Sequence, residues 1–239
     1  MRIAIVSDIH GNRLALDAVL KDLFQTSPDL ICHGGDLAAN GAQPAEIIDQ
    51  IRTLGWPGVC GNTDEMLWAP ERLTELKTLH PKLSPILGAF QDMRGTTCEW
   101  IGPERIDWLR TLPPVFSQGI MSLVHASLDD LWRAPLPTAS NDELQDLYGP
   151  LKSRIVVYAH IHRPYVRLLP GSIVANSGSV SLTYDGDPRA SYLLIDDGHI
   201  IIRRVEYDVE SAAQELQRSG LPHADWLCTI LRSGCYQPP

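Results

Sequence analysis

Carboxylates and imidazoles, two kinds of side chain that bind metal ions, recur in this sequence just after short apolar runs. With one asparagine they make up the set Asp8, His10, Asp36, Asn62, His125, His160 and His162. Hard oxygens combined with imidazole nitrogens suit Mn²⁺, Fe or Zn²⁺ and give little reason for a thiophilic site. The set exceeds what one ion usually takes from side chains, so it suits two ions sharing a bridging carboxylate. Two ions about 3.5–4 Å apart can hold a hydroxide and clamp a phosphoryl group for in-line attack.

Each of these residues has a plainer interpretation when it is taken alone. A single histidine at a strand end is more often structural, and an aspartate there is commonly a cap or a turn former. Asn62 follows a glycine and would usually be a turn residue. The plain interpretations become weak together, because independent accidents would have to recur at every strand end.

Strand and helix patterns alternate along the first part of the chain. Apolar runs predict strands near 3–6, 30–32, 58–60, 120–124, 155–158, 166–169, 173–175, 192–195 and 200–205. Helices are expected after Asn12, from Pro44 and over 209–218. Ligands bind outside the carboxyl ends of strands in parallel sheets, so five strand ends should deliver the polar set to one edge of the molecule.

Residues 65–115 have a different pattern from the rest of the chain. They are helical, contain Trp68, Trp100 and Trp108, and are interrupted by prolines. We expect a helical insertion that caps the sheet inside a single domain over 1–239, because no Pro/Gly linker divides the chain. A chain of this length can bury a sizeable core without disulfides or structural metals.

Charge and composition exclude several classes of partner. The formal net charge of −9 argues against a general grip on long nucleic acid or on an anionic membrane. No stretch approaches the roughly 20 apolar residues of a membrane span, and the apolar run before Ser7 is too short for a signal peptide. Five cysteines without a CxxC pair fit reduced thiols. We expect a cytoplasmic protein, with homo-oligomerisation left open.

Five ordered blocks resemble the signature sequences of the calcineurin-like metallophosphoesterases. They are Asp8-Ile9-His10-Gly11-Asn12, Gly35-Asp36, Gly61-Asn62-Thr63-Asp64, His125 and Ala159-His160-Ile161-His162. Residues 176–179 and 185–192 look like the small bacterial and archaeal phosphodiesterase branch related to diadenosine tetraphosphatase. The resemblance implies an α/β fold, a two-sheet α/β sandwich, with a dinuclear site at one edge.

The resemblance also implies a role for each ligand. Asp8, His10 and His162 would hold one ion, Asn62, His125 and His160 would hold the other, and Asp36 would bridge them. Mn²⁺ is the expected ion, with Fe, Zn²⁺ and Ni²⁺ left open. The implied reaction is hydrolysis of a phosphodiester or phosphomonoester, in a small molecule or nucleotide, by a metal-bridging hydroxide. Asn62 and His125 would then act in catalysis, and His125 would stabilise developing charge on the phosphoryl oxygens.

Three positions depart from the family pattern. Thr63 stands where the family usually has a histidine that protonates the leaving oxygen, and an alcohol cannot act as a near-neutral acid. Ala159 replaces a usual glycine, which is a mild change if its φ is negative. Ser177 replaces a usual proline, which loosens that turn but keeps Asn176 and Ser179 beside the site.

The sequence also offers candidates for contact with the substrate. Asn12, Arg13, His33 and Arg163 are candidates, because arginine suits bidentate phosphate contact, although a solvated surface cation is the plainer interpretation of Arg13 and Arg163. Thr63 also motivates a second hypothesis, a catalytically weak scaffold that binds a partner or nucleotide. A third is a protein phosphatase, which a cap over the site would disfavour.

Overall fold

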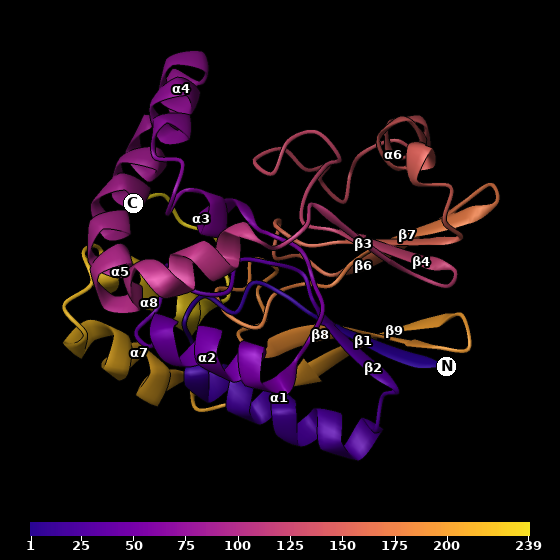
Figure 1. The fold of residues 1–239 in the computed structure, drawn as a ribbon, viewed down its shortest axis with the longest axis horizontal. Helices are drawn as coiled ribbons and strands as arrows, with labels where there is room; N and C mark the ends of the chain where they lie inside the picture. The colour runs from indigo at the N-terminus through magenta and orange to yellow at the C-terminus, as the bar shows by residue number, and fades with distance from the viewer.

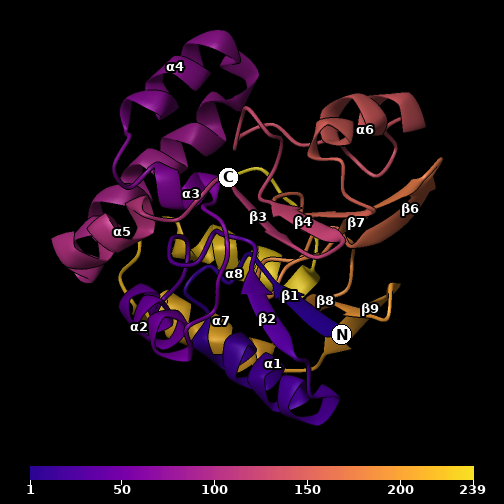
Figure 2. The same cartoon turned by 45° about the vertical axis from the view of Figure 1, so that its right-hand side comes forward.

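Two β-sheets packed against each other form the centre of the computed structural model, which describes residues 1–239. Helices α1, α2 and α7 lie outside one sheet, and α6 lies outside the other (Figures 1 and 2). The strands are β1 (Arg2–Val6), β2 (Leu30–His33), β3 (Val115–Gln118), β4 (Met121–Val124), β5 (Ile155–Tyr158), β6 (Tyr165–Leu169), β7 (Ser172–Asn176), β8 (Ala190–Asp196) and β9 (His199–Val205). The two-sheet α/β sandwich expected from the resemblance is therefore confirmed.

The helices fall into an N-terminal group, a central group and a C-terminal pair. They are α1 (Arg13–Thr26), α2 (Pro44–Leu54), α3 (Asn62–Glu65), α4 (Glu71–Leu79), the 3₁₀ turn η1 (Pro81–Leu83), α5 (Ser84–Arg110), α6 (Asn141–Tyr148), the 3₁₀ turn η2 (Gly149–Leu151), α7 (Val209–Arg218) and α8 (Ala224–Ser233). The Asn12 side chain caps α1 by accepting a hydrogen bond from the Ala15 N–H, as its position predicts.

Both sheets mix parallel and antiparallel pairs. The first has the order β2-β1-β8-β9, with β1 and β2 parallel. The second has the order β3-β4-β5-β7-β6, with β4, β5 and β7 parallel. Consequently the carboxyl ends of β1 and β2 in the first sheet, and of β4, β5 and β7 in the second, are available to form a site.

The core between the sheets is built from short continuous apolar strands. Ile3 and Ile5 of β1 pack with Leu123 of β4 and with Ile155 and Val157 of β5. The opposite face of β1, through Ala4 and Val6, packs against α1 and α2. Because β1 is buried on both faces, its side chains do not alternate between apolar and polar. Burial on both faces holds the end of β1 in place, and the metal-binding residues Asp8 and His10 follow directly after it.

The central helices share the core of the first sheet. Leu73 of α4, and Leu87 and Leu109 of α5, belong to the same buried cluster as Ala4 and Val6. Helix α5 is kinked at Gly102, where φ is 70°, directly before Pro103. Prolines also mark helix ends in this segment, because Pro70 precedes α4, Pro81 begins η1, and Pro113 and Pro114 follow α5; Pro85 instead lies in the first turn of α5.

Four elements differ from the sequence expectation. The weak strand near 58–60 is reduced to one parallel bridge between His33 and Gly58. Strand β3 and helices α6 and α8 were not expected. Helix α6 is short and begins at the Ser140 cap, and α8 buries Leu227, Ile230 and Leu231 on one face. Short elements such as these are stabilised by their tertiary contacts more than by their own pattern.

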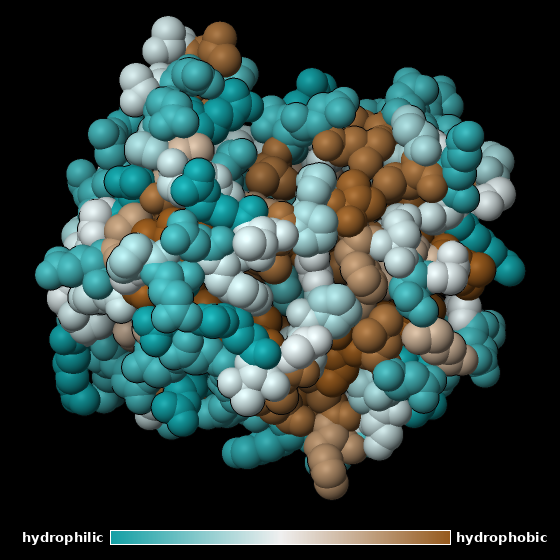
Figure 3. Space-filling view, in the orientation of Figure 1, coloured by the Kyte–Doolittle hydropathy of each residue, from teal (hydrophilic) through white to brown (hydrophobic).

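Apolar side chains are also found on the surface. On the face in Figure 3 they gather over the strand side of the molecule, and the helical side carries more polar ones. Leu168 of β6 is 72% exposed and Ile120, beside β4, is 48% exposed. No helix is both long enough and apolar enough to cross a membrane. Homo-oligomerisation through these exposed apolar side chains stays a prediction.

His33 is buried at the end of β2 without a hydrogen-bond partner for either ring nitrogen. Its ring lies 6.4 Å from the Trp108 ring, centroid to centroid, and closely approaches Gly58, where a Cβ would come within 2.4 Å of it. Burial lowers the pKa of His33 to about 4. The imidazole is therefore neutral when the protein is folded and gains a proton more readily when it unfolds.

Replacement of His33 by phenylalanine should protect the protein from acid. Because the pKa of His33 is about 4 when folded and about 6.5 when unfolded, the unfolded state binds more protons below pH 6.5. Stability is thus lost as the pH falls from about 6.5 towards 4. Urea unfolding of the metal-free protein should show His33→Phe gaining about 2 kcal/mol on the wild type between pH 7.5 and pH 5. A gap between the two proteins that does not change with pH would contradict this account.

Candidate metal centre

The seven predicted ligands come together in one buried cluster. Asp8 and His10 follow β1, Asp36 follows β2, and Asn62 opens α3. His125 follows β4, while His160 and His162 follow β5. The ligands thus leave strands of both sheets, not of one parallel sheet as the strand-end pattern first indicated. The sandwich brings the two sets of carboxyl ends to the same edge.

Four of the ligands form a compact group on one side of the cluster. Asp8, His10, Asp36 and His162 each present one ligand atom, and these atoms all lie within 4.8 Å of one another. Nε2 of His162 lies 3.4 Å from Asp8 Oδ1 and 3.3 Å from His10 Nε2. All four residues are buried. This arrangement can hold a cation.

The remaining three ligands meet at the Asn62 carbonyl oxygen. Asn62 Oδ1 lies 2.9 Å from His125 Nε2 and 2.8 Å from His160 Nδ1. The Asp36 carboxylate lies between the two groups, with Oδ1 3.6 Å from His125 Nε2 and Oδ2 3.7 Å from His10 Nε2. One carboxylate oxygen therefore faces each set of ligands.

Backbone carbonyls orient three of the imidazoles. Nδ1 of His10 lies 2.9 Å from the Ala39 carbonyl oxygen, and Nδ1 of His125 lies 2.8 Å from that of Gly34. Nδ1 of His162 is 2.6 Å from the Leu182 carbonyl oxygen. A carbonyl can only accept, so each Nδ1 carries the proton and each Nε2 keeps its lone pair toward the cluster. Such partners are typical of histidines that bind metal ions.

The charges of the cluster also favour a cation. Burial opposes ionisation of Asp8, but the nearby imidazoles, His162 first, outweigh it and lower the pKa of Asp8 to about 2. Burial, with the neighbouring His162, lowers the pKa of His10 to about 4. Burial, with His125, lowers the pKa of His160 to about 3. The cluster therefore contains an ionised carboxylate beside imidazoles with free lone pairs.

Two further groups of the cluster have pKa values raised by the carboxylate of Asp8. Burial, reinforced by the charge of Asp8, raises the pKa of Asp36. The carboxylate of Asp8 raises the pKa of His162 despite the opposing effect of burial. Asp8 Oδ2 is in addition buried without a hydrogen-bond partner, so the donor set fits a divalent ion.

The backbone at the ligands is held in an uncommon conformation. Asp8, His10, Asp36, His160 and His162 all have positive φ, between 47° and 68°. Left-handed backbone costs about 1–3 kcal/mol for each such residue and persists only where the surroundings enforce it. Five ligands in this conformation indicate that the loops are shaped for the cluster and not for their own stability.

Close packing of two glycine-containing loops explains part of that shape. A Cβ at Gly61 would come within 2.1 Å of Asp36 Oδ1, and one at Gly35 would come within 2.5 Å of the Gly61 nitrogen. The Asp64 carboxylate accepts hydrogen bonds from the N–H groups of Gly61, Asp36 and Leu37. Asp64 thus ties the Asp36 loop to the Asn62 turn. Asp64 is the last residue of the Gly61-Asn62-Thr63-Asp64 block, and its pattern alone does not indicate this role.

The segment after β7 supports the Asp8 and His160 loops. The Ser179 hydroxyl donates to the Asp8 carbonyl at 3.0 Å, and Asn176 Nδ2 donates to the Ala159 carbonyl at 2.6 Å. Ser177, at the usual proline position, shares a 2.7 Å hydrogen bond with Ser7. Ala159 is not among the residues with positive φ, so its Cβ is tolerated where the family has glycine.

A cavity of about 200 Å³ opens over the cluster. His10, Asp36, Asn62, His160 and His162 contribute to its lining. Thr63, which the sequence also placed at the site, lines it as well, but the sequence did not indicate the rest of the wall, which is Asn40, Leu83, Ile86, Leu87, Phe90, Trp132, Tyr184 and Tyr236. The only signal for these residues was the expectation that 65–115 caps the site, and Leu83 to Phe90 lie in that segment.

The four predicted substrate contacts are not part of this lining. Asn12 caps α1, and its Nδ2 donates to Ser181 Oγ. Arg13 is exposed, 3.6 Å from Asp17. His33 packs against Trp108, and Arg163 Nε donates to the Tyr184 carbonyl. Contact of any of the four with substrate stays a prediction.

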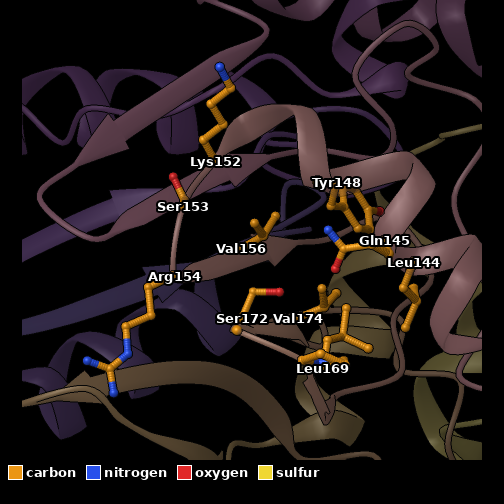
Figure 4. Close-up of a pocket in the computed structure, with 13 residues that line it drawn as sticks. Leu144, Gln145, Tyr148, Lys152, Ser153, Arg154, Val156, Leu169, Ser172 and Val174 are labelled. Atoms are coloured by element: carbon orange, nitrogen blue, oxygen red, sulfur yellow. The ribbon is translucent and has the colours of Figure 1, made fainter.

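A second cavity, of about 380 Å³, lies between α6 and the amino ends of β5 and β7 (Figure 4). This is the end of β5 opposite to the ligands. Lys152 and Arg154 at its rim point away from its centre in Figure 4. None of the residues that line it has a buried polar side-chain atom without a hydrogen-bond partner. It has no chemistry comparable to that of the first cavity.

Comparison with known proteins agrees with this geometry. Residues 1–164 match the Calcineurin-like phosphoesterase family. An uncharacterized protein, MJ0912 of Methanocaldococcus jannaschii, is 29% identical over 94% of this chain and 95% of its own length. A metallophosphoesterase from Sphaerobacter thermophilus has a TM-score of 0.78 and 26% identity, covering 98% of this chain and all of its own. A hypothetical protein, PH1004 of Pyrococcus horikoshii OT3, shares the fold at TM-score 0.83 and 19% identity, over 99% of each chain. The chain therefore belongs to the calcineurin-like phosphoesterases.

Proposed function

We propose that this protein hydrolyses a phosphodiester or phosphomonoester of a small molecule or nucleotide, using two divalent metal ions, with Mn²⁺ as the expected ion. The position of Asp36 carries the proposal. Its two carboxylate oxygens face His10 and His125 at 3.7 and 3.6 Å, so one carboxylate can serve both ligand sets. Membership of the family supports a metal-dependent hydrolase.

Each side chain of the cluster has a defined part in this proposal. Asp8, His10 and His162 would hold one ion, and Asn62, His125 and His160 the other. Two ions held in this way supply the activated water that attacks phosphorus and stabilise the negative charge on the phosphoryl oxygens. Asn62 contributes a neutral oxygen and so leaves more net positive charge for the substrate than a carboxylate would.

The leaving oxygen needs a proton from another source than the usual histidine. Thr63 lies at that position, and its N–H donates to Asp36 Oδ1 at 2.8 Å. Its hydroxyl is buried, has no partner and belongs to a residue that lines the cavity. An alcohol can donate a hydrogen bond to a phosphoryl oxygen but is too weak an acid to protonate the leaving group. Esters with good leaving groups should therefore be the better substrates.

The direct test is turnover of bis-p-nitrophenyl phosphate and p-nitrophenyl phosphate by purified protein supplied with Mn²⁺. We expect hydrolysis that disappears with a chelator and returns on addition of Mn²⁺. A folded protein that contains metal and hydrolyses neither ester would instead support a binding scaffold. A phosphopeptide tested beside these esters addresses the protein phosphatase hypothesis, for which we expect little activity.

Replacement of Asp36 by asparagine should remove the shared ligand. We expect metal content to fall below two ions per chain and turnover to fall by more than about 100-fold, the upper end of what loss of a supporting group costs a metal site. Asp22→Asn is a matched control, because Asp22 is a partly buried carboxylate on α1 that accepts hydrogen bonds from Arg203 and Tyr192. Near-normal turnover by Asp36→Asn, with two ions retained, would exclude the dinuclear proposal.

Introduction of histidine at position 63 should restore the missing acid. In Thr63→His we expect at least about tenfold faster hydrolysis of phenyl esters, with much less change for p-nitrophenyl esters, because general acids matter most for poor leaving groups. Thr63→Val, which removes only the hydroxyl, is the control and should not show this selectivity. Equal effects on both ester classes, in a variant that retains its metal, would place the proton donor elsewhere.

A further inference from the structure

The cavity over the cluster has two chemically different parts. Its base is formed by the metal-binding side chains, and its wall is largely apolar, with Ile86, Leu87 and Phe90 of α5 among its members. Neither lysine nor arginine lines it. Arg163 follows the ligand His162 in sequence, but its Nε is held by the Tyr184 carbonyl at 2.9 Å. Cations for a second or third phosphate are thus missing from the wall.

The charge balance at the base suits one phosphoryl group. The two divalent ions of the proposed function, together with the carboxylates of Asp8 and Asp36, leave a net charge of about +2. An ester of a single phosphate carries between one and two negative charges near neutral pH. The longer chain of a polyphosphate would have to place its remaining charges against apolar side chains, which is unfavourable without partners.

Aromatic rings stand on the wall in two pairs. Phe90 and Trp132 have ring centroids 6.3 Å apart, and the Trp132 indole N–H donates to Glu65 Oε2 at 2.8 Å. Tyr184 lies almost parallel to the His162 ring, 4.4 Å away and inclined by 14°, and meets Tyr236 edge-on at 5.4 Å. These contacts fix the rings of Trp132 and Tyr184 before any ligand binds.

Tyr236 belongs to the C-terminal segment, which reaches the same cavity. The chain ends close to α3 and α5 in both ribbon views. The Trp226 indole N–H holds this segment through the Gln237 carbonyl at 2.8 Å, and the Gly234 carbonyl accepts from the Gly186 N–H. The Tyr236 side chain is 43% exposed, so it forms part of the open rim of the cavity.

Building on the proposed function, we infer that the substrate is an ester of a single phosphoryl group with an aromatic substituent, such as a nucleobase-bearing or aryl alcohol. The phosphoryl group binds at the ligand cluster, and the ring lies against Phe90, Trp132, Tyr184 and Tyr236. Stacked and edge-on aromatic contacts give this ring its affinity. Polyphosphate compounds are excluded as preferred substrates, because the wall has no cations for their additional charges.

Phosphonates test this inference separately from hydrolysis, because their carbon–phosphorus bond is not an ester. Calorimetric titration of the Mn²⁺-loaded protein should show phenylphosphonate binding about tenfold more tightly than methylphosphonate. Adenosine 5′-monophosphate should bind at least as tightly as adenosine 5′-triphosphate, with Mn²⁺ in excess over nucleotide. Equal binding of the two phosphonates, or tighter binding of the triphosphate, would overturn the inference even if esters are hydrolysed.

Tyr236→Ala tests whether the rim supplies the aromatic contact. The variant should reduce the ratio of phenylphosphonate to methylphosphonate affinity by about threefold or more, since one ring of the wall is lost. Phe24→Ala is the matched control, because Phe24 is an exposed aromatic side chain on α1, 85% accessible and outside the cavity. An unchanged ratio in Tyr236→Ala, or an equal reduction in the control, would count against the assignment. Protein that binds phenylphosphonate selectively but hydrolyses no ester would refute the proposed function and would leave intact the assignment of the wall as a subsite for an aromatic phosphoryl compound.

Discussion

Two buried carboxylates within 4.8 Å of each other, those of Asp8 and Asp36, are the constraint on which the rest of the structure depends. Like charges at this separation in a poorly solvated place repel strongly. The protein has no lysine or arginine against them and surrounds them with imidazoles instead. Neutral imidazoles cannot balance two negative charges, but they can bind a metal ion that does. The composition of the cluster therefore indicates that it binds a cation.

The loops around these carboxylates carry the energetic cost of bringing them together. Five ligands adopt left-handed backbone, and Gly35 and Gly61 allow two loops to approach to distances that a Cβ would prevent. Asp64 then joins these loops through three backbone N–H groups. The strands that precede the loops are buried on both faces, and their packing holds the strained segments in place. Packing within the sandwich thus stabilises the fold enough to maintain the strained loops at its edge.

The ligands could be predicted from the sequence because each follows an apolar strand in order, and the resemblance then assigned their roles. The role of Asp64 could not be predicted, because it acts by accepting hydrogen bonds from backbone N–H groups, and a sequence motif does not show which backbone groups lie nearby. The wall of the cavity was beyond prediction for a different reason. Trp132 and Tyr236 come from a loop and from the chain terminus, and only the folded chain brings them beside Phe90. Helix α8 has a regular apolar face, with Leu227, Ile230 and Leu231, so its own pattern could have indicated it, whereas α6 is short and buries only Leu144 and Tyr148.

This division between a predictable base and an unpredictable wall has a chemical basis. The base must meet the fixed geometry of metal ions and a phosphoryl group, so its residue types and their order are restricted. The wall meets only the part of the substrate that differs from one ester to another, and many apolar side chains can serve there. Thr63 lies at the boundary, on the base by position but without the acid–base chemistry expected of it. In the proposed function, this threonine would move discrimination between substrates toward the leaving group and toward the aromatic wall, because the chain supplies no strong general acid at that position.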